Sequence, residues 1–279
     1  MNPKQQACPI CQSKISSELH TLNSGQLVRC GECTLVYFSP LPTPGELEAF
    51  YNSASYRDYY SHSDMADSTF ALQRYQHLDK VLKISEASLS SKGRLLDIGC
   101  GHGDFLEIAA AAGWDVTGTE LSQEAVNRAP SSLQSSIHIG DIVNLDLSQS
   151  QYSLITMYHI IEHLLDPVQS LKRALDLLRP QGILFVETPN LGGLGARLRG
   201  KRWSNIIPPE HLLYFEGKSL RFALESAGFH SVKVFSSAPQ SIASIAKLPK
   251  AAKASAAVIY QAVPALGMGA LLQAIALRP

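Results

Sequence analysis

Residues 94–113 read RLLDIGCGHGDFLEIAAAAG, and this stretch decides the fold. Its first five residues predict a short buried strand, and three glycines in the pattern GxGxG follow. A helix is expected to begin at Asp104, which has the spacing of a capping box with Glu107, and to stop at Gly113. The order of strand, glycine turn and helix predicts an open α/β sheet that binds a ligand beside the turn.

The spacing of the glycines favours one class of ligand. A dinucleotide fingerprint places its last glycine one residue further on, as GxGxxG, and it receives a pyrophosphate. Here Asp97 lies two residues before Gly99, and a carboxylate at this place repels a pyrophosphate but attracts an ammonium or a sulfonium. S-adenosyl-L-methionine carries both cations, so the sequence predicts this molecule as the cofactor.

Two later strand ends extend the predicted adenosyl site. Glu120 follows the strand expected over 115–119 and lies 21 residues after Gly99, where a carboxylate can accept hydrogen bonds from ribose hydroxyls. The strand near 137–139 is followed by a carboxylate and an apolar side chain, which suit an adenine amino group and ring. The predicted cofactor-binding residues are Asp97, Gly99, Gly101, Glu120, Asp141 and Ile142.

The N-terminal cysteines predict a second, smaller unit. Cys8 and Cys11 form one CxxC pair, Cys30 and Cys33 form another, and 18 residues separate the pairs. This is the spacing of a zinc ribbon, in which four thiolates complete a closed tetrahedral site of structural type. Four unrelated thiols are the alternative. A redox pair is less favoured, since neither CxxC opens a βαβ pattern.

Composition limits the remaining possibilities. With 279 residues and 45% hydrophobic content, the chain can bury one substantial core and a small appendage. Basic and acidic residues both number 24, so no nucleic-acid partner is expected and a small or neutral substrate fits better. The N-terminus lacks the apolar core of a secretory signal, which favours a cytoplasmic protein. The expected units are a zinc ribbon over 1–40, a connector and helical cap over 41–90, and a catalytic domain over 91–279.

The sequence resembles the class I S-adenosylmethionine-dependent methyltransferases, in particular the branch of ubiquinone-type O-methyltransferases and zinc-bearing sugar C-methyltransferases. The resemblance rests on LLDIGCGHGDFL at 95–106, GTEL at 118–121, GDI at 140–142, YHIIEHLLDP at 158–167 and PPEHLLYF at 208–215. It implies a Rossmann-like α/β sheet of seven strands with an antiparallel last strand. It also implies a small-molecule, sugar or lipid-linked glycan acceptor that is methylated at oxygen or carbon.

Histidines gather after the fourth and fifth expected strands, over 152–157 and 183–188. The carboxyl ends of such strands face the ligand, so these side chains are candidates for removing a proton from the acceptor. His211 is the preferred base, and His163 is expected to be mainly structural. Pro208 replaces the tyrosine of the zinc-bearing C-methyltransferases, which leaves O-methylation at least as strongly indicated. The candidate catalytic residues are His211, Glu210, His163 and His159.

Several alternatives stay open at this stage. His159, Glu162 and His163 form HxxEH, close to the ExxEH ligand set of metal-dependent relatives, and a catalytic divalent ion with His211 as a further ligand is one of them. The basic segment 191–209 is interpreted as a mobile lid that meets an anionic acceptor or a membrane surface, or as a solvated loop. RNA methylation and a non-catalytic adenosyl-binding module are competing functions. The sequence does not predict the oligomeric state.

Overall fold

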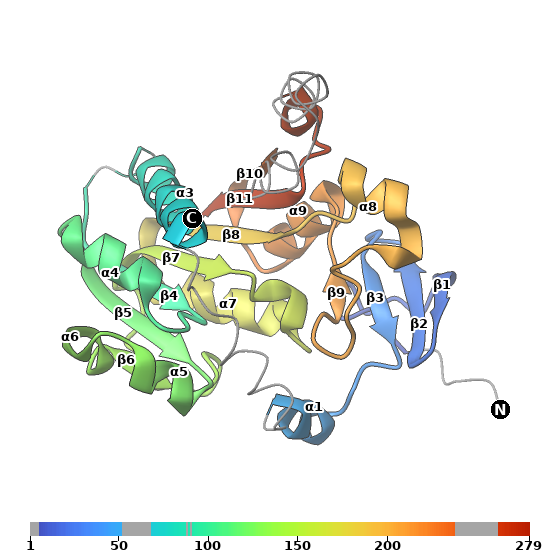
Figure 1. The fold of residues 1–279 in the computed structure, drawn as a ribbon, viewed down its shortest axis with the longest axis horizontal. Coiled ribbons are helices and arrows are strands. Elements are labelled where there is room, and N and C mark those ends of the chain that lie inside the picture. The colour runs from blue at the N-terminus through green and yellow to red at the C-terminus, as the bar shows by residue number, and fades with distance from the viewer. Residues whose placement is uncertain (1–5, 52–67, 88, 90, 238–261) are drawn as a thin grey trace.

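The computed structural model describes residues 6–51, 68–87, 89, 91–237 and 262–279, which form two sheets (Figure 1). The larger sheet has seven strands in the order β10-β11-β8-β7-β4-β5-β6. Its strands are β4 (Arg94–Ile98), β5 (Asp115–Glu120), β6 (Ile137–Ile139), β7 (Tyr152–Tyr158), β8 (Leu178–Pro189), β10 (His230–Ser237) and β11 (Leu271–Leu277).

The topology of this sheet agrees with the prediction. Neighbouring strands from β6 to β8 are parallel, and β11 is antiparallel to both β8 and β10. Strand β7 is buried along nearly its whole length, as expected for a sheet covered on both faces. The predicted seven-stranded α/β fold with an antiparallel last strand is therefore confirmed.

Helices cover both faces of the sheet (Figure 1). Helices α3 (Ser68–Glu86) and α4 (Asp104–Ala111) pack on one face, in a cluster of buried side chains that includes Leu95. Helices α7 (Pro167–Leu177) and α9 (Gly217–Ser226) pack on the other, in a cluster that includes Leu96. Successive residues of one strand thus serve opposite faces. Short helices α5 (Gln123–Arg128) and α6 (Ser131–Gln134) flank β5 and β6.

The predicted capping box at the start of α4 is wrong. The residue at the cap position is Gly103, with φ 83°, which has no side chain that could accept a hydrogen bond there. Asp104 is instead the first helical residue and is buried. The reason is that the chain leaves the glycine turn in the left-handed region, which places the glycine at the cap position. A reciprocal capping box does occur at Glu216 and Ser219, at the start of α9.

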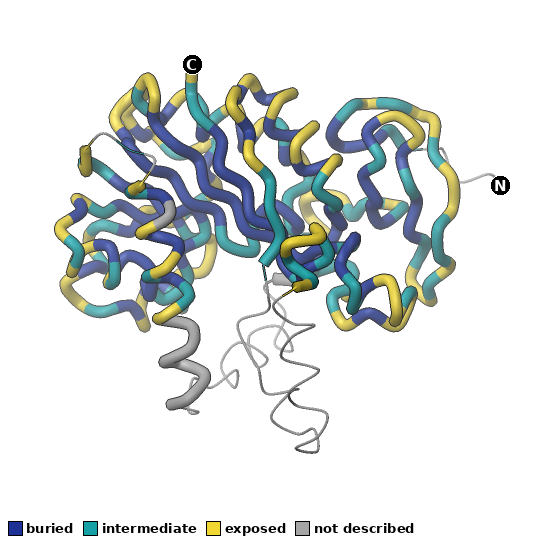
Figure 2. Tube along the Cα trace, turned by 90° about the horizontal axis from the view of Figure 1, so that it is seen from above, coloured by how far each residue is buried: buried dark blue, intermediate teal, exposed yellow. Residues whose placement is uncertain are grey.

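The smaller sheet joins the N-terminal segment to the larger part of the molecule. Its order is β1-β2-β3-β9, in which the first three strands come from the N-terminus and β9 (Leu213–Tyr214) begins two residues after His211. Strand β9 pairs with β3 through Val36 and Tyr37. Buried side chains of both parts form one continuous cluster, visible in Figure 2 as dark blue on both sheets. The N-terminal strands are β1 (Ser16–Leu22), β2 (Gly25–Cys30) and β3 (Val36–Ser39).

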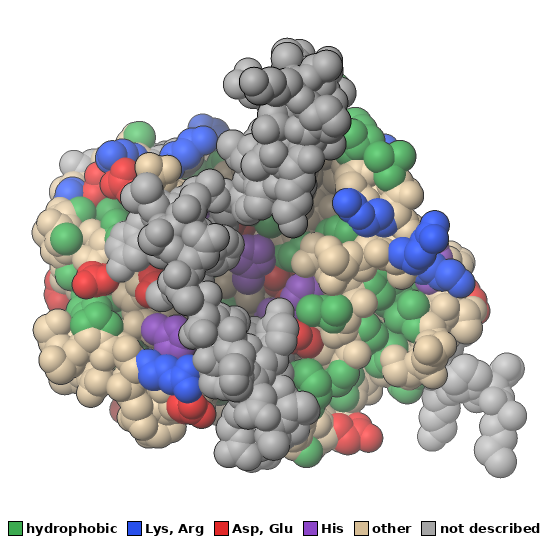
Figure 3. Space-filling view, viewed as in Figure 1, with side chains coloured by type: hydrophobic (Ala, Val, Ile, Leu, Met, Phe, Trp, Pro, Cys, Tyr) green, Lys and Arg blue, Asp and Glu red, His purple; other side chains and the backbone are tan. Residues whose placement is uncertain are grey.

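The predicted lid folds onto the molecule as α8 (Leu194–Arg199) and the short helix η2 (Gly200–Arg202). Figure 3 shows basic side chains over this part of the surface, but Trp203 is only 7% exposed. The ring of Trp203 packs in the core and does not add to the exposed surface of this segment, and the choice between a lid and a solvated loop stays a prediction. Among the described residues, no helix has both the length and the apolar character needed to cross a bilayer.

The expected connector is described only in part. Helix α1 (Pro44–Tyr51) follows the N-terminal sheet, and α3 begins at Ser68. The aromatic-rich residues 52–67 lie outside the described residues, as does most of the Ala-rich stretch before β11. The expected unit boundaries, at residues 40 and 90, stay predictions.

Candidate active site and metal centre

The glycine turn between β4 and α4 leaves its backbone open at the carboxyl edge of the sheet. Gly99 and Gly101 have φ values of 71° and 56°, which disfavour any residue with a side chain. A Cβ at Gly99 would lie 2.1 Å from Cδ1 of Ile160, whereas a Cβ at Gly101 would meet no described atom within 4 Å. The turn is therefore tightly packed on one side and accessible to a ligand on the other.

Two polar side chains lie beneath the turn. Asp97, at the end of β4, is 3% exposed and accepts a hydrogen bond of 2.6 Å from Oγ1 of Thr156. The hydroxyl of Tyr158 is buried and has no hydrogen-bond partner in the described part of the chain. Burial, together with the carboxylates of Glu187 and Asp97, raises the pKa of Tyr158 well above its usual value. A buried hydroxyl without a partner is unfavourable, so the site fits a polar ligand.

Glu120 ties the glycine turn to the end of β5. Its Oε2 accepts a hydrogen bond from the backbone N–H of Gly101 at 2.9 Å. Its Oε1 accepts from the backbone N–H groups of Leu121 and Ser122 at 2.8 and 2.9 Å. The structure thus brings Glu120 beside the turn, as the sequence predicts, and adds a positioning contact that spacing did not reveal.

The third predicted strand end lies next to Glu120, because the N–H of Gly140 donates to the Glu120 carbonyl at 2.9 Å. Asp141 is exposed, and its Oδ1 accepts from the backbone N–H of Val143. Ile142 is only 3% exposed and packs in the core. Sequence reasoning missed two apolar side chains that stay exposed at these strand ends, Leu121 at 66% and Ile139 at 44%.

His159 lies at the carboxyl end of β7 between two buried carboxylates. Its Nδ1 is 3.2 Å from Oε1 of Glu162, and its Nε2 is 3.5 Å from Oε1 of Glu187. Burial disfavours the imidazolium, but these two carboxylates outweigh burial and raise the pKa of His159 to about 10. A histidine that is already protonated at neutral pH cannot accept a proton, so this geometry argues against His159 as the base.

Glu162, His163 and His211 form a second cluster, whose ligand atoms all lie within 4.8 Å of one another. The Nδ1 of His163 donates to the carbonyl of Glu210 at 2.8 Å, and the Nδ1 of His211 donates to the carbonyl of Asn205 at 2.9 Å. Since a carbonyl only accepts, each Nε2 keeps its lone pair. Burial lowers the pKa of both histidines, which keeps them neutral. The cluster can take up a proton or bind a cation.

The two histidine segments are held together by the backbone. The N–H of Leu212 donates to the carbonyl of Glu162 at 2.9 Å, and the rings of His163 and His211 meet edge to face with centroids 4.8 Å apart. Glu210 contacts His163 through its carbonyl, so the expected role of its side chain beside His211 stays a prediction. Figure 3 shows histidine side chains close together near the middle of this face.

Glu187 is a site residue that sequence reasoning missed. It lies on β8 with 0% exposure, and His77 of α3 places Nε2 2.8 Å from its Oε2. Burial opposes ionisation, but His159 and His77 outweigh burial and lower the pKa of Glu187 to about 2. A carboxylate inside the apolar run ILFVETP was the available signal. Its partners could not be predicted, because His77 is 110 residues away in the chain.

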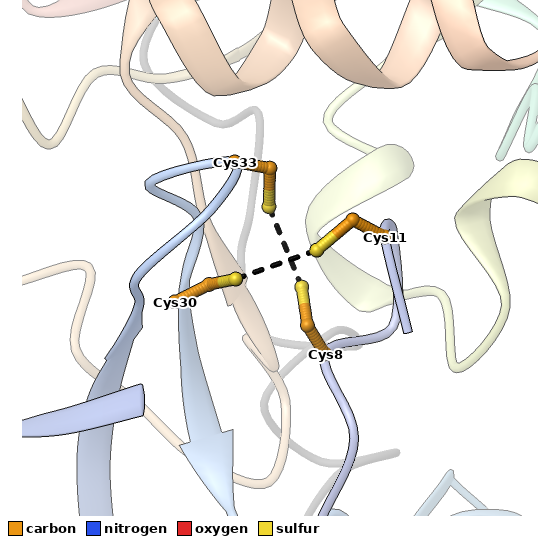
Figure 4. Close-up of side chains that lie close together, drawn as sticks. All are labelled: Cys8, Cys11, Cys30 and Cys33. Carbon is orange, nitrogen blue, oxygen red and sulfur yellow. Dashed lines mark hydrogen bonds between the residues drawn. The ribbon is translucent and has the colours of Figure 1, made fainter. Parts of the chain in front are cut away.

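The four N-terminal cysteines point toward one another (Figure 4). The Sγ atoms of Cys8 and Cys33 are 3.4 Å apart, those of Cys11 and Cys30 are also 3.4 Å apart, and all four lie within 4.8 Å of one another. A tetrahedral zinc with Zn–S bonds of about 2.3 Å separates its sulfurs by about 3.8 Å. The cluster is therefore compatible with the predicted zinc ribbon.

Comparisons with known proteins agree with this architecture. Residues 70–234 match the family model of the methyltransferase domain, which is more than half of the chain, and the chain belongs to this family. It is similar to the ubiquinone biosynthesis O-methyltransferase of Coxiella burnetii (strain RSA 493 / Nine Mile phase I), with 33% identity over 115 residues, 39% of this chain and 49% of that protein. The chain thus spans about half the length of the curated relatives it matches.

Solved structures show the same fold. A SAM-dependent methyltransferase from Archaeoglobus fulgidus has a TM-score of 0.54 and 21% identity, over 77% of this chain and 100% of that chain. Phosphoethanolamine N-methyltransferase 2 of Haemonchus contortus, in complex with S-adenosyl-L-methionine, has a TM-score of 0.57 and 14% identity, over 88% of this chain and 62% of that chain. The resemblance to class I methyltransferases is confirmed at the level of family and fold.

Proposed function

We propose that the protein transfers a methyl group from S-adenosyl-L-methionine to a hydroxyl of a small-molecule acceptor. The proposal rests on two features at the same edge of the sheet. One is the open glycine turn, and the other is His211, which is neutral and keeps the lone pair on its Nε2. The first suits the cofactor and the second suits removal of a proton. The similarity to O-methyltransferases supports oxygen as the methyl acceptor.

The residues at the strand ends fit the cofactor. S-adenosyl-L-methionine supplies an electrophilic methyl group on its sulfonium. Asp97 offers a buried carboxylate to the ammonium, and the hydroxyl of Tyr158 offers a further hydrogen bond. Glu120 and Asp141 are proposed to bind the ribose and the adenine amino group, and the exposed Leu121 is proposed to provide an apolar contact to the ring. Ile142, which packs in the core, supports this edge of the site from below.

The chain's own contribution to catalysis is orientation and proton removal. An acceptor hydroxyl becomes nucleophilic when its proton passes to Nε2 of His211, and such base catalysis contributes about 10² to 10⁴ in rate. The ring of His163 packs against the ring of His211 and holds it in place. Glu162 stabilises the imidazolium of His211 that forms when the proton is accepted. His159, already cationic, adds positive charge beside the developing oxyanion.

A second proposal concerns the same cluster. Glu162, His163 and His211 present one carboxylate oxygen and two imidazole nitrogens within 4.8 Å, a donor set that suits a divalent cation. Such an ion would be held by these three side chains and would lower the pKa of the acceptor hydroxyl, and His211 would then be a ligand and not the base. At the N-terminus, we propose that Cys8, Cys11, Cys30 and Cys33 hold one structural zinc.

The acceptor class is proposed to be a phenol, a sugar or a lipid-linked glycan, since the formal charge of zero gives no general attraction to nucleic acid. The test is a screen of such hydroxyl compounds and of RNA, which measures S-adenosylhomocysteine release with and without EDTA. Release with a hydroxyl compound supports the proposal, and sensitivity to EDTA favours the cation. Cofactor binding without release on any acceptor would indicate a non-catalytic module, and release on RNA alone would indicate RNA methylation.

A further inference from the structure

Side chains from three distant segments of the chain contact Glu187. Besides His77, its Oε2 accepts a hydrogen bond of 2.5 Å from Nε2 of Gln273 on β11, and His159 contacts its Oε1. A fully buried carboxylate is unfavourable unless charged or hydrogen-bonding partners compensate it. These contacts therefore fix which segments meet at the carboxyl end of β8.

Of these partners of Glu187, His77 lies outside the sheet, on α3. Its contact shows which end of α3 lies at the carboxyl edge of the sheet. At the far end of the helix, Glu86 accepts a hydrogen bond of 2.9 Å from Nε1 of Trp114, which comes just before β5 at the amino edge of the sheet. Helix α3 therefore runs from the carboxyl edge to the amino edge. Its residues 68–76 precede His77 and, at about 1.5 Å per residue, extend roughly 14 Å further toward the ligand side.

The second half of α3 is already secured by packing. Leu78 and Leu82 are buried in one cluster with Cys100 of the glycine turn and Phe105 of α4. The first half has one described polar anchor to the sheet, the contact of His77 with Glu187. Among the side chains that the structure describes on α3, His77 is thus the one that ties this half of the helix to the carboxyl end of the sheet.

We propose that His77 is a positioning residue that holds the first half of α3 against the ligand side through Glu187, so that the helix forms one wall of the cofactor and acceptor site. Its effect on catalysis rests on the proposed function. Its effects on helix protection and on binding of S-adenosylhomocysteine do not need an acceptor, and they are measured separately.

The experiment compares His77→Ala, His77→Gln and the control Lys80→Ala, an exposed position on the same helix. In His77→Ala, amide hydrogen exchange of residues 68–76 should quicken at least tenfold, with β4 and β7 unchanged. Affinity for S-adenosylhomocysteine should fall about fivefold by isothermal titration. His77→Gln keeps an N–H donor and should recover at least half of each loss, and Lys80→Ala should match wild type.

A further variant separates positioning from general stability. Gln273→Leu removes a different contact of Glu187 without touching α3. Equal quickening of α3 exchange in Gln273→Leu and His77→Ala would overturn the proposal, as would a His77→Ala protein indistinguishable from Lys80→Ala. Lack of methylation by the wild-type protein on every acceptor would instead count against the proposed function and leave the exchange comparison readable. With an active acceptor, His77→Ala should raise KM for the cofactor more than it lowers kcat.

Discussion

Three histidines of the same site differ in charge because their neighbours differ. His159 lies between Glu162 and Glu187, and its pKa rises to about 10. His163 is partly buried and His211 is buried, and the Nδ1 of each donates a hydrogen bond to a backbone carbonyl. Burial lowers the pKa values of both. Position along the chain does not distinguish these residues, but hydrogen-bond partners do.

His211→Ala should lower kcat by about 10² or more and leave cofactor affinity nearly unchanged. Because burial lowers the pKa of His211, the neutral base persists to lower pH, and the wild-type rate should fall only below about pH 6.5, the ordinary histidine value. The mutant should lack this acid limb. His230→Ala, at an exposed position on β10, is the control. A pH profile in His211→Ala identical to that of wild type would remove His211 as the base.

Asp97→Asn should weaken cofactor binding by about ten- to a hundredfold, since a charge-assisted hydrogen bond contributes about 1.5 to 3 kcal/mol. The amide keeps the volume of the carboxylate and can still accept from Thr156, so the domain should stay folded. Isothermal titration with S-adenosyl-L-methionine measures the change, and Asp115→Asn at the opposite end of the strands is the control. Wild-type affinity in Asp97→Asn would contradict the proposed cofactor site.

Part of the site could be predicted residue by residue because its members lie close together in the sequence. Asp97, Gly99 and Gly101 follow one strand, and the fold brings Glu120 to them by parallel pairing of β4 and β5. Glu187 was not predicted, because its partners come from helices and strands far away in sequence. The charge of each histidine could not be predicted either, since it depends on hydrogen-bond partners that only the fold brings together.

At the scale of elements, predictions from hydrophobic pattern succeeded where the strands were long and buried. Strands β4 and β7 agree with the expected ranges to within one residue, whereas β8 begins five residues before its expected start at 183. The two-residue strand β9 was not predicted, since so short a stretch carries no periodic pattern and depends on pairing with β3. The capping box predicted for α4 was wrong for a related reason. The geometry of the preceding glycine turn determined the cap position, and the local residue preference did not.

The N-terminal element should contain one zinc per chain. The four Sγ atoms already lie within 4.8 Å of one another, and four thiolates give a closed site whose binding free energy also stabilises the fold. Elemental analysis of protein purified without chelator should give a stoichiometry near one, and Cys30→Ser should reduce it sharply. Cys100→Ser, which changes the cysteine outside the cluster, should keep the metal. A stoichiometry near zero in the wild type would exclude the zinc ribbon.

At the scale of the whole molecule, the cysteine cluster and the proposed base are mechanically linked. Strand β3 follows the second CxxC, strand β9 follows His211, and the two strands pair. Loss of the metal in Cys30→Ser should therefore lower kcat at least tenfold while the affinity for S-adenosyl-L-methionine changes less than threefold, because the glycine turn lies on the other sheet. Kinetics and titration on the same sample provide the comparison. Full activity in a metal-free protein would show that the two parts work independently.

The shared strand also bears on how such a protein can evolve. A unit that only touched its neighbour could be exchanged between relatives by recombination near residue 40. Here the exchange would separate β3 from β9 and would mix two halves of one hydrophobic core, which had been selected to fit each other. The N-terminal sheet and the segment from His211 to β9 should therefore be inherited together, and a chimera should function only when both come from one parent.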